Sequence, residues 1–170
     1  LDIRGRARLA VRRWGVKAIF VDYLQLVSHV GAQSRENEVG FVSRGLKAMS
    51  MELGVPVIAA AQVNRKSEDR SDNRPKMSDL RESGSIEQDA DVVLLLHRPA
   101  YYAADQETEP DPQDAELHIA KHRAGATGKV NLVWRPRLTR FENAALGDRT
   151  TDGGDSVYAP SRQVQEVFYK

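Results

Sequence analysis

Three short apolar runs along the chain each predict a β-strand, at residues 18–21, 56–61 and 91–96. Their apolar positions do not alternate with polar ones, so we expect strands buried on both faces, as in the parallel sheet of an α/β protein. Further along, residues 115–123 and 129–134 do alternate, around a glycine-bearing turn. This pattern predicts an antiparallel hairpin at the C-terminal side of the parallel sheet.

Residues 3–14 predict a helix, because apolar side chains recur there every three or four positions, the last of them being Trp14. We expect this apolar stripe to face the core. A second stripe on the same helix is basic: Arg4, Arg8 and Arg12. Such a stripe is typical of a solvated face, and a contact with a partner subunit or with DNA is the alternative.

A second helix is predicted at 35–53, between the first two strands. Ser34 is suited to cap its first turn, and Gly54 is suited to end it. Strand, helix and strand in this order form a βαβ unit, whose crossover connects two parallel strands. The sequence therefore predicts an α/β fold in which a parallel sheet with helical crossovers precedes the hairpin.

Composition is that of an ordinary globular domain: 41% hydrophobic and 29% charged residues, with a formal net charge of +1. The chain contains no cysteine, which excludes disulfides and thiolate metal sites. We expect no membrane span and no secretion signal, because no apolar run approaches the necessary length. Since the chain begins at Leu1, we expect it to be a piece of a longer protein.

Two polar side chains follow the first two predicted strands. Asp22 comes directly after 18–21, and Gln62 directly after 56–61. Because parallel strands end at the same edge of a sheet, both residues are expected at the edge where α/β folds bind ligands. An apolar strand ending in aspartate is the Walker B pattern, whose carboxylate holds Mg²⁺ beside nucleotide phosphates. The alternatives are a strand entering a turn and a glutamine beginning a surface loop.

Four segments carry a resemblance to one family, the DnaB-type replicative DNA helicases. They are Asp-Tyr-Leu-Gln-Leu at 22–26, the run at 78–91 that begins Ser-Asp-Leu-Arg-Glu-Ser-Gly, the basic Lys-x-Arg-x-Gly-x-x-Gly element at 121–128, and Thr-Arg-Phe-Glu-Asn at 139–143. The segments occur in the order that the family has them. The resemblance implies a partial RecA-like P-loop ATPase core.

For the nucleotide, the resemblance implies ATP and Mg²⁺ as cofactors. Asp22 would then hold Mg²⁺ through water, as the metal residue, and Gln62 would sense the γ-phosphate. Lys121 and Arg123 would reach the ATP that is bound by the neighbouring subunit, where an arginine finger stabilises transition-state charge. His122 stands between them, at a position where the family usually has glutamine.

For DNA, the resemblance places Arg81, Glu82 and Gly84 on a loop that contacts the single-stranded backbone. Arginine supplies charge and glycine lets the main chain approach a phosphate, whereas a glutamate would act by positioning the arginine. Residues 63–78 form a polar stretch with several basic side chains, and we assign Arg74 of this stretch to the same DNA site. A mobile solvated loop would have a similar composition.

The resemblance runs from about Trp14 to Asn143, and we assign residues 1–144 to the C-terminal part of a motor domain. Residues 145–170 are predicted to be a flexible tail. No Gly-x-x-x-x-Gly-Lys-[Ser/Thr] motif is present. We therefore expect the chain alone to be inactive. The full-length protein is expected to couple ATP hydrolysis to 5′–3′ translocation on single-stranded DNA and to unwinding at the replication fork.

The implied partners are single-stranded DNA, five further copies in a homohexamer, a primase and a helicase loader, in the cytoplasm. Two alternatives stay open. A RecA-like recombinase-type ATPase would account for Asp22 and Gln62 but not for the run at 78–91. A non-catalytic assembly or DNA-binding module of RecA-like fold would bind DNA or subunits without turnover.

Overall fold

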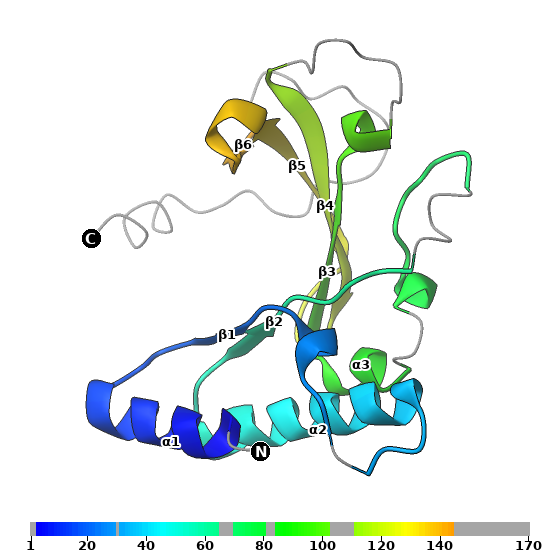
Figure 1. Cartoon of the computed structure of the whole chain (residues 1–170). Helices are drawn as coiled ribbons and strands as arrows, with labels where there is room; N and C mark the ends of the chain where they lie inside the picture. Colours follow the sequence, from blue (N-terminus) through cyan, green and yellow to red (C-terminus); the bar gives the residue numbers. More distant parts are fainter. Residues whose placement is uncertain (1–2, 30, 65–69, 81–83, 103–110, 145–170) are drawn as a thin grey trace. The chain divides into compact units, whose positions relative to one another are not determined.

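The structure is a computed structural model that describes residues 3–29, 31–64, 70–80, 84–102 and 111–144 (Figure 1). The chain divides into two compact units, Leu1–Asp91 and Val92–Lys170. The tail predicted at 145–170 lies outside the described residues. Among the described helices, none is long and apolar enough to cross a membrane.

The first unit is built around a parallel strand pair with a helical crossover. Its elements are α1 (Ile3–Trp14), β1 (Ile19–Val21), a 3₁₀ turn (Leu24–Leu26), α2 (Arg35–Leu53), β2 (Val57–Ala59), a second 3₁₀ turn (Met77–Asp79) and α3 (Gly84–Asp89). β1 and β2 pair in parallel, with Ile19 opposite Val57 and Val21 opposite Ala59. The predicted βαβ unit is confirmed, and α2 is its crossover (Figure 1).

The ends of α2 follow the expected capping chemistry. The Ser34 hydroxyl accepts a hydrogen bond from the Asn37 amide at 3.1 Å, which satisfies a free N–H of the first turn. At the other end, Gly54 adopts a left-handed conformation with φ of 64°. A residue with a Cβ is strained there, so the glycine is what allows the helix to stop.

The core of this unit lies between the helices and one face of the strand pair. Buried side chains from α1, α2, α3 and the first 3₁₀ turn form one cluster, and Ile19, Val21 and Val57 pack against it. Phe20 and Ile58 point to the other face and are 75% and 45% exposed. The expectation of burial on both faces was therefore wrong for these strands, because in the described part of the chain the helices pack against one face only.

The basic stripe of α1 is exposed, as predicted, and two of its arginines make an ion pair that the sequence did not predict. Arg4 and Arg8 both bond the Glu52 carboxylate near the end of α2, with Arg8 Nε at 2.8 Å from Oε1. These two arginines lower the pKa of Glu52, Arg8 having the larger effect. Both arginines are exposed, as expected of a solvated face, and they also tie α1 to α2. Trp14 was expected in the core and is instead 69% exposed.

The second unit is an antiparallel sheet in the order β3-β4-β5-β6. Its elements are β3 (Val92–His97), a 3₁₀ turn (Pro99–Tyr102), β4 (Gln113–His122), β5 (Gly128–Arg135), a 3₁₀ turn (Pro136–Leu138) and β6 (Arg140–Asn143). The predicted hairpin is confirmed as β4–β5. The α/β class, with parallel strands and a C-terminal antiparallel hairpin, is confirmed as well.

The strand predicted at residues 91–96 was expected in the parallel sheet, and this expectation was wrong. β3 pairs antiparallel with β4, and in the described part of the chain it forms no ladder with β1 or β2. Its side chains alternate: Val93 and Leu95 are buried, whereas Leu94 and Leu96 are about half exposed, at 54% and 46%. One packed face is enough to hold an antiparallel strand.

Gly45 inside α2 and Gly54 just after its end predict opposite effects of the same substitution. Gly54→Ala is expected to lower the free energy of unfolding by about 1 kcal/mol, because alanine is strained at a positive φ. Gly45→Ala is expected to raise it by about 0.5–1 kcal/mol, because Gly45 lies in the exposed helix interior with no atom within 4 Å of an added Cβ. Urea unfolding of the two variants beside wild type measures both values. Shifts of the same sign would contradict this account of the helix end.

Candidate functional site

The carboxyl edge of the β1–β2 pair carries Asp22. The pairing continues past the last ladder residues, because the Ala60 amide donates to Val21 O at 2.9 Å and the Leu24 amide donates to Ala60 O at 2.8 Å. Asp22 lies between these two attachment points and is exposed. The peptide bond that follows it is cis. The fold thus holds one carboxylate, with fixed backbone on both sides, at the edge predicted from the sequence.

Gln25 holds Gln62 at the same edge. The Gln25 side-chain amide donates to Gln62 O at 3.2 Å, and its Oε1 accepts from the Gln62 amide at 3.1 Å. A residue of a neighbouring strand would make the same two bonds to Gln62 with its backbone amide and carbonyl. Because the side chain of Gln25 binds only the backbone of Gln62, it fixes the position from which the exposed Gln62 side chain projects.

Gln25 is itself braced by the first turn of α2. Arg35 donates to Gln25 O and pairs with Glu38, whose Oε1 accepts from the His29 amide at 2.8 Å. The His29 amide and then Arg35 lower the pKa of Glu38. The sequence analysis quoted Gln25 in a family segment without assigning it a role. An amide side chain three residues after the carboxylate at the sheet edge was the available signal.

A single carboxylate at this edge is compatible with magnesium. Among the described residues, no group of three or more His, Cys, Asp or Glu side chains gathers in a way that would hold a metal by protein ligands alone. Mg²⁺ commonly keeps several waters and takes one or two carboxylates together with substrate phosphates. The exposed Asp22 fits that mode of binding and does not fit a closed metal cage.

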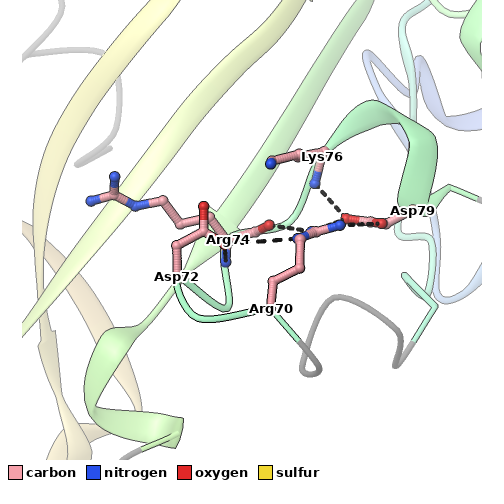
Figure 2. A network of polar contacts seen from close by, with 5 residues as sticks. All are labelled: Arg70, Asp72, Arg74, Lys76 and Asp79. Carbon is pink, nitrogen blue, oxygen red and sulfur yellow. Dashed lines mark hydrogen bonds and ion pairs between the residues drawn. The ribbon is translucent and has the colours of Figure 1, made fainter.

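Residues 70–80 are organised by an ion pair between Arg70 and Asp79, shown in Figure 2. Arg70 Nη1 donates to Asp79 Oδ1 at 3.0 Å, and the Lys76 amide donates to Oδ2 at 2.7 Å. The carboxylate side chain is only 8% exposed. Arg70 and then the Lys76 amide hold the pKa of Asp79 below its ordinary value. The Asn64 amide donates to Asp79 O at 2.9 Å, which ties this segment to the chain leaving β2.

The residues assigned to DNA are only partly described. Arg74 is exposed; its carbonyl accepts from Arg70, and its side chain extends away from Asp79 (Figure 2). Gly84 is exposed at the first position of α3. Arg81 and Glu82 lie outside the described residues. The sequence analysis did not assign the Arg70–Asp79 pair, although the charges stand nine residues apart in the segments that it singled out.

Helix α3 is held close to α2 by a glycine. A Cβ on Gly40 would lie 2.6 Å from Ser85 Oγ, so only a glycine permits this approach without a shift. Ile86, one residue further, is buried in the core cluster. The start of α3, and with it Gly84, is therefore fixed against the crossover helix.

The basic pair of the hairpin belongs to the second unit. Lys121 lies near the end of β4 opposite Val93 of β3, and Arg123 follows the strand and is exposed. The structure therefore brings Asp22 and Gln62 together in one unit, and Lys121 and Arg123 together in the other.

Comparison with known proteins shows the family to which the chain belongs. The profile described as "DnaB-like helicase C terminal domain" matches residues 1–143. The replicative DNA helicase DnaB of Leifsonia xyli subsp. xyli is 47% identical over 85% of this chain, and that of Geobacillus stearothermophilus is 46% identical over 84%. The matched part is 31% of each relative, so the chain spans about a third of their length.

Solved structures agree with that match. A DnaB-like replicative helicase, described with its interactions with primase, superimposes with a TM-score of 0.75 at 40% identity, over 84% of this chain and 35% of that one. The ATPase domain of G40P also has a TM-score of 0.75, at 41% identity, over 84% of this chain and 50% of that one.

Asp79→Asn is expected to loosen residues 70–80, because it removes the charge that Arg70 and the Lys76 amide share. Amide hydrogen exchange in this segment should become at least roughly tenfold faster. Asp72→Asn is the matched control: its carboxylate is 45% exposed and 3.7 Å from Arg70 Nε, and exchange should stay near wild type. Equal effects of the two substitutions on amide exchange would mean that burial of the Asp79 carboxylate contributes nothing to the order of residues 70–80.

The same ion pair predicts a pH dependence. Because the folded pKa of Asp79 is depressed, its stabilisation is complete above the unfolded carboxyl value of about 3.9 and is lost as pH falls through the lower folded value. The amide proton of Lys76, which donates to this carboxylate, reports the titration by NMR. A midpoint at or above the ordinary carboxyl value would contradict the structure.

Proposed function

This chain belongs to the DnaB-like helicases, as a C-terminal domain of that family, and we propose that it forms part of an ATP-driven motor acting on single-stranded DNA. The observation that carries the proposal is the family match over 1–143 together with Asp22 and Gln62 on one sheet edge. The same match favours a helicase over a recombinase-type ATPase.

Asp22 and Gln62, at the edge of the β1–β2 pair, have different roles in nucleotide binding. Asp22 would hold Mg²⁺ through its waters, which suits an exposed carboxylate, and the ion would supply positive charge to the phosphates of ATP. Gln62 hydrogen-bonds the γ-phosphate. Because the Gln62 backbone is bonded to the Gln25 side chain, a change at the phosphate alters the position of Gln25 and of the segment after β2. Loss of the phosphate then changes the position of residues 70–80.

Lys121 and Arg123 act on the ATP of a neighbouring subunit. Both are cationic and close together at one hairpin tip, and Arg123 is exposed there. A positive charge brought to the transferring phosphoryl group stabilises the transition state without covalent chemistry. Because the charge comes from a second subunit, turnover depends on assembly, and we propose a homohexamer.

DNA binds the segment that follows Gln62. Arg74 supplies a charge to the phosphate backbone, together with Arg81, while Gly84 lets the main chain approach and Glu82 positions Arg81. The Arg70–Asp79 pair keeps the segment in shape. Movement of this segment in one subunit relative to the next, driven by hydrolysis, carries the ring 5′–3′ along the strand and unwinds the duplex at a replication fork.

The proposed partners are those of a replicative motor. A primase is supported by the solved relative that is described with its primase interactions, and a helicase loader goes with ring assembly. The proposed location is the bacterial cytoplasm, at the replication fork. The 170 residues contain no P-loop motif, so this chain alone is proposed not to hydrolyse ATP. Binding of DNA without turnover by the full-length gene product would favour the non-catalytic module instead.

Arg123→Ala tests the shared active site. In the full-length gene product, DNA-stimulated turnover should fall by about 10³ while ATP binding stays near wild type, because the lost charge acts in the transition state. Arg137→Ala is the control, since that arginine lies in the same unit with its side chain 86% exposed and should leave turnover unchanged. Turnover that survives Arg123→Ala would remove this residue from catalysis.

Arg74→Gln tests the DNA segment. Affinity of the full-length gene product for single-stranded DNA should fall, and the slope of log affinity against log salt should become shallower by about 0.7, because one phosphate contact is lost. Fluorescence anisotropy at several salt concentrations measures both. Arg6→Gln, an exposed arginine of α1, should change neither. An unchanged slope for Arg74→Gln would place the DNA elsewhere.

A further inference from the structure

The tip of the β4–β5 hairpin extends beyond its ladders. The β4–β5 ladder ends at the Ile119–Gly128 pair, and the β3–β4 ladder ends at the Val92–His122 pair. Arg123 therefore follows the last paired residue of β4. A side chain beyond the last pair of a hairpin samples many directions unless other contacts hold the turn. The question is what holds this turn.

His122 closes the turn with both its backbone and its ring. The carbonyl of His122 accepts from the Gly125 amide at 3.4 Å, and the ring Nδ1 lies 3.3 Å from Ala126 O. Since a carbonyl oxygen only accepts, Nδ1 carries the proton and donates. One residue is thus linked to two positions across the turn.

The imidazole ring of His122 packs against Gly125. A Cβ added there would lie 2.4 Å from Cε1 and 2.6 Å from Nδ1 of His122. The backbone of Gly125 is not in the left-handed region, so the demand for glycine is steric and comes from the ring. Gly128, at the other end of the tip, has no atom within 4 Å of an added Cβ.

We propose that His122 is a positioning residue, whose ring packs onto Gly125 and thereby fixes the directions in which Lys121 and Arg123 project. Lys121 precedes His122 in β4, and neighbours in a strand point to opposite sides, so the ring of His122 on the turn leaves Lys121 on the other face. Arg123 is the first turn residue after β4, and the bond from the Gly125 amide to His122 O fixes the backbone from which it projects. This inference rests on the proposed function of Lys121 and Arg123 in a neighbouring active site.

A glutamine at position 122 could make the same contact. A histidine ring that carries its proton on Nδ1 can donate to Ala126 O, and the side-chain amide of a glutamine can donate to the same carbonyl. His122→Gln should therefore retain function. His122→Ala removes the donor and should lower turnover.

The test uses four variants of the full-length gene product and their DNA-stimulated turnover. His122→Ala and Gly125→Ala should each lower kcat on the order of ten- to a hundredfold, with the KM for ATP unchanged, because they misplace Arg123 without removing it. The double variant should be no worse than either single one, since both changes undo one ring-to-turn contact. His122→Gln and the control Gly128→Ala should match wild type.

A second readout separates this inference from the function on which it rests. In the present chain, amide exchange at residues 123–127 should become faster in His122→Ala and Gly125→Ala, and stay unchanged in Gly128→Ala. If Arg123→Ala abolishes turnover while His122→Ala and Gly125→Ala behave as wild type, the positioning role is overturned and the proposed function stands. If Arg123→Ala is without effect, the proposed function fails, and unchanged exchange would then overturn the positioning of the tip as well.

Discussion

The parallel pairing of β1 with β2 is the constraint on which the first unit depends. It sets Ile19 and Val21 against the helical core and brings the chain after each strand to one edge. Gln25 prolongs that pairing with a side chain in place of a strand residue. Backbone hydrogen bonds and one amide therefore determine where a carboxylate and a second amide project, which is the geometry that a nucleotide edge requires.

Charged groups in this unit stabilise segments rather than form a general basic surface. Glu52 receives two arginines of α1, Glu38 joins the start of α2 to the turn after β1, and Asp79 organises residues 70–80. Each carboxylate has a lowered pKa because its partners favour the ionised form. The arginines that share these carboxylates have structural roles, and for that reason they are poor candidates for DNA contacts.

The same division between support and function recurs in the hairpin of the second unit. The residues that bear the proposed chemistry there, Lys121 and Arg123, flank one that bonds the turn. A glycine in a functional motif is often read as a source of backbone freedom or of close approach to a ligand. Gly125 has a different use, since it makes room for a side chain of its own turn.

Local patterns in the sequence were sufficient for the helices at 3–14 and 35–53, for the caps of the second one, and for the hairpin, because short-range hydrogen bonding and periodicity decide such elements. Strand order and burial were not predictable in this way: β3 has an unbroken apolar run, yet it pairs antiparallel and packs on one face. The partners of Asp79, Gln25 and His122 also depended on contacts that only folding creates. Motif order therefore identified the family, and the three-dimensional packing identified which residues support the site.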